Sequence, residues 1–315
     1  GEGVGCFWSE SRSFINGFDI YFQAIDVNGV IQLATGGNIV AQSNGDDYIK
    51  DIIPTPDGHY LIFWVEEIWP ASRLKFNKID ANGNTAIGWP PNGHSLSNQS
   101  LEANNISVKK ISDSGGVLAV WNQDGNFSDI YAQKINWDGV VQWENFGVPV
   151  CTADNDQSAV SFDIDGDGLY AFISWEDYRN GSDYNIIGKQ ININSGAVSS
   201  EDIYFSSDTT SQQRPLVKAV APGEFILIWE DGRGYYNSDP LLINGVDLYG
   251  SAFLVGSGRT TGIDGIPISV EYHDQKKAQM TKYNGQDYLL HWIDLRSSGK
   301  EDLANYYAKT IRRSD

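Results

Sequence analysis

A tryptophan, an acid and an arginine recur at fixed spacing along this chain of 315 residues. The clearest copies read WEDYR from Trp175, WEDGR from Trp229 and WIDLR from Trp292. A catalytic group is needed once, whereas this set is repeated, so the pattern favours a structural role. In that role the indole fills the space between sheets, the acid accepts turn amides, and the arginine forks onto the acid or nearby carbonyls. The residues assigned to this structural repeat are Trp8, Trp64, Trp121, Trp175, Trp229, Trp292, Asp177, Arg179, Asp231, Arg233, Asp294 and Arg296.

One loop has the spacing of a calcium site. Asp163, Asp165 and Asp167 stand at alternate positions, which lets a loop place several carboxylate oxygens round one ion. The loop lacks the downstream glutamate of an EF-hand, and other copies of the repeat have plain hairpin turns such as TPDG at the same point. The sequence thus offers Ca2+ a place but requires no cofactor.

Two turns carry aromatic residues that the repeat itself does not require. Trp69 lies at an apolar loop tip, and Tyr235 and Tyr236 lie in the longest turn of the chain. Both turns follow the same strand of the repeat, so we expect them on one rim of the fold. Aromatic side chains on loops suit stacking on a sugar or anchoring a protein partner, and they suit covering neighbouring loops equally well. These three are the candidate ligand- or partner-binding residues.

Other catalytic motifs are absent from the sequence. The four histidines form no pair at zinc spacing, and there is neither a nucleophile elbow nor a phosphate-binding loop. The two carboxylates of a glycosidase could still meet in the folded chain, because it has 41 acidic residues.

The elements that hold these residues are short strands. Six tryptophans each end an apolar run such as YLIFW or YAFISW, at intervals of 54 to 63 residues, and such runs are typical of strands. After each tryptophan comes a polar turn and a second strand, whose copies read DIYFQAI, RLKFNKI, DIYAQKI, NIIGKQI, DLYGSAF and NYYAKTI. Hairpin turns such as DVNG and NWDG follow. Each unit therefore has four strands.

Four-stranded antiparallel units of about 55 residues predict the blades of a β-propeller. The fold class is all-β, with six blades in a single domain over residues 1–315. The copies span approximately 1–45, 46–99, 100–153, 154–209, 210–272 and 273–315. The first copy lacks its innermost strand and the last its outermost, so either the end blades are incomplete or the chain is an excised part of a longer protein. We expect the second.

The composition limits the classes of partner that we expect. The formal net charge of −19 opposes binding to nucleic acid or anionic lipid, and no apolar run is long enough for a membrane helix. The two cysteines, Cys6 and Cys151, are too few for a disulfide scaffold, and the sequence leaves their pairing open.

The combination of W-x-D-x-R, D-I-Y-A-Q and the segment GVPVCTADNDQ from Gly147 to Gln157 resembles a repeat of large secreted Bacteroidetes proteins. Those proteins often carry a sorting domain for type IX secretion. The resemblance covers nearly the whole chain, is strong in the third and fourth copies, and is degraded in the second, where WVEEI and RLKFN replace the consensus. It implies a propeller exported to the cell surface and little about activity.

We therefore expect a secreted or cell-surface propeller that acts as a binding, adhesion or assembly module without catalysis. Its partner would be a protein or a glycan at the cell surface, and a place in a larger assembly is compatible with this reading. The alternative is a carbohydrate-active propeller, either a lectin with sites repeated between blades or a glycoside hydrolase or polysaccharide lyase with one axial acidic site. A lectin predicts several equivalent pockets, whereas an enzyme predicts one.

Overall fold

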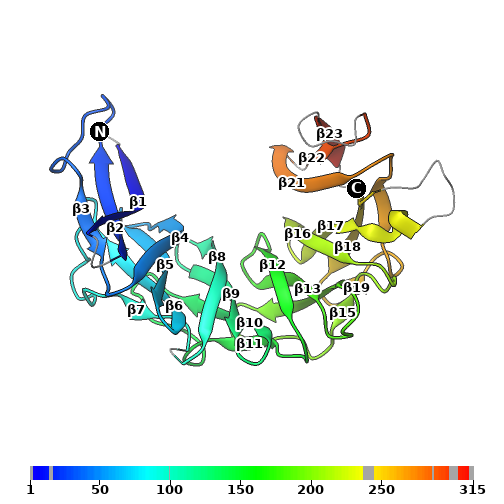
Figure 1. Cartoon of the computed structure of the whole chain (residues 1–315), viewed down its shortest axis with the longest axis horizontal. Helices are drawn as coiled ribbons and strands as arrows, with labels where there is room; N and C mark the ends of the chain where they lie inside the picture. The colour runs from blue at the N-terminus through cyan, green and yellow to red at the C-terminus, as the bar shows by residue number, and fades with distance from the viewer. Residues whose placement is uncertain are drawn as a thin grey trace. The chain divides into compact units, whose positions relative to one another are not determined.

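The computed structural model describes residues 3–13, 17–98, 100–236, 245–285, 287–297 and 304–311, with the side chains of residues 13, 235 and 236 left out. Its regular structure is six antiparallel sheets and one short 3-10 helix, η1 (Gly232–Tyr236). The all-β class predicted from the sequence is confirmed. Figure 1 labels most of the strands.

The strands are grouped here into sheets A to F. Sheet A contains β1 (Val4–Ser13), β2 (Gly17–Ile25) and β3 (Asn38–Ala41); sheet B contains β4 (Asp46–Pro54), β5 (Tyr60–Ile68), β6 (Ala71–Ile79) and β7 (His94–Ser95). Sheet C contains β8 (Glu102–Ser112), β9 (Gly116–Asp124), β10 (Ser128–Ile135) and β11 (Val148–Cys151); sheet D contains β12 (Gln157–Ile164), β13 (Tyr170–Asp177), β14 (Asn185–Asn192) and β15 (Ile203–Tyr204). Sheet E contains β16 (Gln212–Ala221), β17 (Glu224–Asp231), β18 (Asp247–Leu254), β19 (Gly258–Arg259) and β20 (Ile266–Ser269); sheet F contains β21 (Gln275–Asn284), β22 (Asp287–Asp294) and β23 (Asn305–Ile311).

Each sheet lies within one copy of the sequence repeat. Sheets A and F have three described strands, and sheets B, C and D have four. Sheet E has five, because the hairpin after β18 forms the extra short strand β19, where sheets A to D have a single bridge such as Ile25 to Ile31. The chain divides into two compact units, Gly1–Thr152 with sheets A to C and Ala153–Asp315 with sheets D to F.

The register of the two middle strands brings the repeated aromatic residues together. Trp121 lies directly opposite Tyr131 in the pairing of β9 with β10, and their rings stack with centroids 6.2 Å apart. Trp292 and Tyr307 do the same in sheet F, also at 6.2 Å. Cross-strand aromatic pairs of this kind stabilise a sheet and fix its register.

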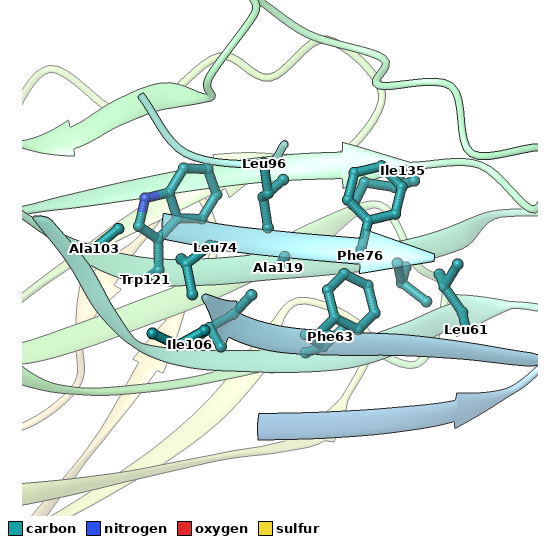
Figure 2. Close-up of a cluster of buried hydrophobic side chains, with 13 residues drawn as sticks. Leu61, Phe63, Leu74, Phe76, Leu96, Ala103, Ile106, Ala119, Trp121 and Ile135 are labelled. Atoms are coloured by element: carbon teal, nitrogen blue, oxygen red, sulfur yellow. The ribbon is translucent and has the colours of Figure 1, made fainter. Parts of the chain in front are cut away.

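Each core lies between neighbouring sheets. Trp121 and its neighbours on sheet C pack against Leu74 and Phe76 of sheet B, as Figure 2 shows. In the same way Trp64 of sheet B packs with residues of sheet A, and Trp229 of sheet E with residues of sheet D. A four-stranded sheet cannot bury both faces alone, and the tryptophan of the next sheet supplies the missing apolar surface.

A glycine holds the tip of the tryptophan ring in four sheets. Gly93, with a φ of +67°, places its backbone so close to Trp64 that an added Cβ would lie 2.4 Å from Cη2 of the indole. Gly265 stands in the same relation to Trp229, at 2.3 Å. These positions require glycine both for the left-handed backbone and for the close approach.

Cys6 and Cys151 are both unbridged. Among the described residues, no helix has the length and apolar character needed to cross a membrane.

Candidate functional site

The tryptophan, acid and arginine of the repeat form one hydrogen-bonded clamp. In sheet D the indole Nε1 of Trp175 donates to Asp177 Oδ2 at 2.7 Å, and Arg179 donates to Asp177 through its backbone N at 3.1 Å and its Nε at 2.7 Å. Sheet E repeats the arrangement with Trp229, Asp231 and Arg233. Sheet F repeats it with Trp292, Asp294 and Arg296.

The arginine of the clamp also covers a tyrosine of the next strand. The Arg233 guanidinium lies 3.9 Å from the ring centroid of Tyr249, and Arg296 lies 4.2 Å from that of Tyr307. Cation–π contact adds to the ion pair. Because the same groups meet in several sheets, the clamp fastens the fold.

Sheets B and C depart from the clamp. In sheet B the acid position is Glu66 and the arginine position is Ile68, so Trp64 donates its Nε1 to Asp47 of β4 instead, at 3.0 Å. In sheet C the acid position is Gln123, and the buried Trp121 Nε1 has no hydrogen-bond partner in the described part of the chain.

Asp47 is a carboxylic acid in an unusual environment. It is 1% exposed and lies opposite Glu66 in the pairing of β4 with β5. Burial raises the pKa of Asp47 to about 7, and the negative charge of Glu66 adds to the rise, against the lowering effect of the Trp64 hydrogen bond. Asp47 is thus partly protonated near neutral pH.

The exposed end of the β5–β6 hairpin bears a hollow of about 420 Å³, here called the Trp69 hollow. Trp69 is 93% exposed beside it. The residues that line the hollow are Asp46, Glu67, Trp69, Pro70, Ala71, Ser72 and Glu102. Asp46 lies directly opposite Glu67 in the strand register, and Asp46 Oδ1 accepts the backbone N–H of Phe18 at 2.8 Å. An aromatic face therefore stands next to three carboxylates.

The same hairpin end contributes to a second hollow of about 400 Å³, here called the Glu66 hollow. Its lining residues are Gln42, Ser43, Asn44, Glu66, Ile68, Lys75 and Asn92. Lys75 Nζ lies 3.2 Å from Glu66 Oε1, and the two side chains are only 12% and 10% exposed. Glu66 and Ile68 line this hollow whereas Glu67 and Trp69 line the other, as the alternation of a strand requires.

Two buried glutamates in the second unit each bind a backbone amide of the next sheet. Glu176 accepts the backbone N–H of Arg214 at 2.8 Å, and Glu230 accepts that of Lys277 at 2.7 Å. Burial raises the pKa of each carboxyl. Both amides belong to residues with positive φ at irregularities of the next sheet's first strand. Each of these glutamates thus joins its own sheet to the next sheet.

The aspartates proposed for calcium also act between strands. Asp163 Oδ2 accepts the backbone N–H of Ala219 at 3.0 Å, and Asp165 accepts those of Leu169 at 2.8 Å and Gly223 at 3.3 Å. Asp167 is exposed. Within the described ranges, no group of three or more His, Cys, Asp or Glu side chains could hold a metal ion.

Of the aromatic candidates, Trp69 alone has a described side chain. Tyr235 and Tyr236 end the helix η1, and their side chains lie outside the described residues. The sequence reasoning missed the carboxylates round Trp69 and the residues of the Glu66 hollow. The signal that could have found them is the loss of the W-x-D-x-R pattern in the second copy, which supplies most of the lining residues of both hollows.

Comparisons with known proteins support the fold class. No family model and no curated protein matches the chain. Among solved structures, the polysaccharide lyase Uly1 matches 94% of this chain and 69% of its own at 11% identity and a TM-score of 0.51. An α-L-arabinofuranosidase of Fusarium graminearum, solved with arabinobiose, matches 82% and 79% at 11% identity and a TM-score of 0.47. An endo-arabinase from Bacteroides thetaiotaomicron matches 84% and 93% at 9% identity and a TM-score of 0.41.

The fold is thus of the β-propeller class, as predicted, while the count of six blades stays a prediction. The expectation of a binding, adhesion or assembly module without catalysis is corrected. The solved structures named above are a polysaccharide lyase, an α-L-arabinofuranosidase and an endo-arabinase, all of them enzymes by name, and at this identity they show the fold alone. The physical reason for the error is that the repeat pattern reports how the sheets are joined and is silent on what their ends bind.

Proposed function

We propose that this protein is a carbohydrate-active β-propeller that binds a neutral glycan in the Trp69 hollow. The observation that carries the proposal is the 93% exposed indole of Trp69 beside the carboxylates of Asp46, Glu67 and Glu102. The fold shared with a polysaccharide lyase agrees with this proposal, but a fold hosts many activities, so the hollow is the argument.

The chemistry of the hollow suits a sugar. An indole face packs against the C–H groups of a sugar ring, and carboxylate oxygens accept hydrogen bonds from its hydroxyls. Three carboxylates and the net charge of −19 repel a polyanionic glycan. A neutral polysaccharide is therefore the favoured ligand class.

The described hollows differ in their lining residues, which favours one specialised site over the repeated pockets of a lectin. A third hollow is lined by Asp202, Ile203, Tyr204, Arg259 and Ile263. It has one carboxylate, a tyrosine and an arginine, whereas the Trp69 hollow has an indole and three carboxylates. Of these three hollows, the Trp69 hollow alone has both an exposed indole and three carboxylates.

Hydrolysis at the same hollow is a second candidate function, and the strand register favours it. Asp46 and Glu67 are directly opposite each other in an antiparallel pair and line the same hollow. Opposite residues have Cα atoms about 4.5–5.5 Å apart, so the register places both side chains at one point of the hollow, and a glycosidase needs its two carboxyl groups roughly 5–9.5 Å apart. One carboxyl group would protonate the leaving oxygen, while the other would act as nucleophile or activate the attacking water.

The wider setting belongs to the same proposal. The six sequence copies support six blades in one propeller, and the resemblance to exported Bacteroidetes repeats supports a secreted or cell-surface location. Carbohydrate polymers are met outside the cell, so location and ligand agree.

A glycan array read with purified protein tests the function. We expect saturable binding to neutral oligosaccharides, and a loss of at least about tenfold in affinity for Trp69→Ala, since stacking on an aromatic anchor is worth about 1–3 kcal/mol. The matched control is Tyr306→Ala, because Tyr306 is 79% exposed and lies in β23, outside the hollow. Absence of glycan binding, or equal binding by both variants, would overturn the proposal.

A further inference from the structure

The Glu66 hollow lies where other sheets place the arginine of the clamp. In sheet A, Arg12 Nη2 donates to the carbonyl of Gly36 at 2.7 Å, and in sheet E, Arg233 Nη2 donates to the carbonyl of Asp264 at 3.0 Å. Gly36 and Asp264 each precede the glycine that touches the tryptophan ring, Gly37 or Gly265. The guanidinium thus spans from the end of one strand to this loop.

In sheet B the two ends of that span are Ile68 and Asn92. Ile68 takes the arginine position, and Asn92 precedes Gly93, the glycine against Trp64. Both residues line the Glu66 hollow. An isoleucine is too short to cross the span, so the hollow of about 400 Å³ includes the space that a guanidinium fills in the other sheets.

The charge of the missing arginine is supplied from another strand. Lys75 of β6 lies 3.2 Å from Glu66 Oε1, and Arg73 Nη1 lies 3.7 Å from Glu66 Oε2. Because Glu66 already has cationic partners, no charged ligand is needed in the hollow to neutralise its carboxylate. Sheet B therefore lacks the arginine of the clamp, and Glu66 still has cationic partners.

The remaining lining is suited to a neutral polyhydroxylated ligand. Asn44 and Asn92 each offer an amide donor and an amide acceptor. Gln42 already donates to Asp19 Oδ2 at 3.0 Å, which leaves its amide oxygen as an acceptor, and Ser43 Oγ accepts the Gly45 N–H at 3.1 Å. Sugar hydroxyls both donate and accept hydrogen bonds, so this lining can pair with several of them at once.

We propose that the Glu66 hollow is a second glycan subsite, which takes a neutral sugar unit of the same chain that stacks on Trp69. This inference rests on the proposed function. The two hollows lie on the two faces of one hairpin end, because Glu66 and Ile68 alternate with Glu67 and Trp69. A chain of several sugar units would pass round this end and contact both.

The test fills the space with the residue that the repeat uses elsewhere. Ile68→Arg restores the consensus and should leave the fold intact, while Ile68→Ala keeps the hollow open and serves as its control. The probes are a neutral disaccharide and a long neutral oligosaccharide of the type that the array identifies, measured by calorimetry. Thermal unfolding of each variant is recorded alongside.

Wild-type protein should bind the long chain more tightly than the disaccharide, because the second subsite adds contacts within one ligand. Ile68→Arg should lower the long-chain affinity about tenfold or more and leave disaccharide affinity unchanged. Ile68→Ala should keep the preference for the long chain, and Trp69→Ala should weaken both probes.

The two proposals fail in different ways. If Ile68→Arg binds both probes as the wild type does, while Trp69→Ala loses them, the second subsite is refuted and the function stands. If the wild-type protein binds neither probe, the function itself is refuted. If Ile68→Ala loses the long-chain preference as fully as Ile68→Arg, the apolar contact and not the open space carries the effect, and the subsite as described is wrong.

Discussion

The indole Nε1 of Trp175 donates a hydrogen bond to Asp177 Oδ2 at 2.7 Å, two residues further along the same strand. Side chains two apart in a strand lie on one face, so the carboxylate is placed beside the indole by the backbone alone. The same carboxylate then binds Arg179 at the start of the turn, with Nε at 2.7 Å from Oδ1. Three side chains within five residues thereby fasten a strand end.

The clamp should contribute strongly where it is buried. Asp177→Ala leaves the Trp175 indole without an acceptor and the half-buried Arg179 with one partner fewer, so we expect the free energy of unfolding to fall by about 3 kcal/mol. Urea denaturation followed by tryptophan fluorescence measures the change. The matched control is Glu10→Ala in sheet A, where the Arg12 and Glu10 side chains are 36% and 46% exposed, and there we expect a much smaller loss because solvent screens the pair. Equal losses at the two sites would show that burial does not govern the clamp.

The stability of the first unit should depend on pH through Asp47. Its folded pKa of about 7 lies above the ordinary value of 3.8, so the protonated form stabilises the fold. This contribution is complete below about pH 4 and is lost as the pH rises to about 7, by an amount on the order of 4 kcal/mol. Asp47→Asn keeps an oxygen for Trp64 and cannot ionise. We expect it to exceed the wild type in stability at pH 8 and to match it near pH 4.

Asp247 offers an independent check of the same physics in sheet E. Burial raises its pKa to about 7 as well, with the charge of Asp231 opposite it as a further cause. Asp247→Asn should therefore show the same growing advantage between pH 4 and pH 8 in denaturation experiments. A stability difference that is flat over this range in both variants would contradict the assignment.

The glycine under the indole should be intolerant of a side chain. Gly93→Ala places a Cβ 2.4 Å from Trp64 and 2.7 Å from the Phe76 carbonyl, at a φ of +67°. The control is Gly29→Ala, which has a φ of +79° and nothing within 4 Å. We expect Gly29→Ala to cost about 1 kcal/mol from backbone strain, and Gly93→Ala to cost about 1–3 kcal/mol more from crowding. Thermal unfolding resolves the difference, and equal shifts would mean that the ring is not held by this glycine.

Hydrolysis at the Trp69 hollow makes a separate prediction. Glu67→Gln and Asp46→Asn each remove one member of the opposed carboxyl pair while preserving shape, and the asparagine can still accept the Phe18 amide. We expect each to reduce release of reducing sugar from a bound glycan by at least about a hundredfold, with glycan affinity changed little. Product is measured by chromatography. Binding without any product in the wild type would leave recognition as the function and reject hydrolysis.

Much of the fold could be predicted because the repeat encodes local contacts. The strand ending at Trp121 and the strand containing Tyr131 follow from their apolar and alternating residues, and the turn between them sets the register that stacks the two rings. The clamp of Asp231 and Arg233 is equally local. Such contacts need only the neighbouring residues, so a sequence pattern contains them.

The candidate site depends on contacts between distant parts of the chain, which no spacing reveals. Asp47 accepts the Trp64 indole across 17 positions, and Asp163 accepts an amide from Ala219 of another sheet. Asp165, like Asp163, accepts an amide from a neighbouring sheet, and the alternate spacing of these candidate calcium ligands does not show that contact. Ile68 and Asn92 become a hollow only when the repeated arginine is known to span them.

The clamp has one consequence for the history of such chains. The tryptophan, acid and arginine of the clamp lie within five consecutive residues. A duplicated segment therefore contains the whole clamp and needs no matching change in its neighbours. The second copy has Ile68 at the arginine position, whereas Arg12, Arg179, Arg233 and Arg296 stand there in other copies. Because several sheets have the clamp, one sheet without it can present a different surface.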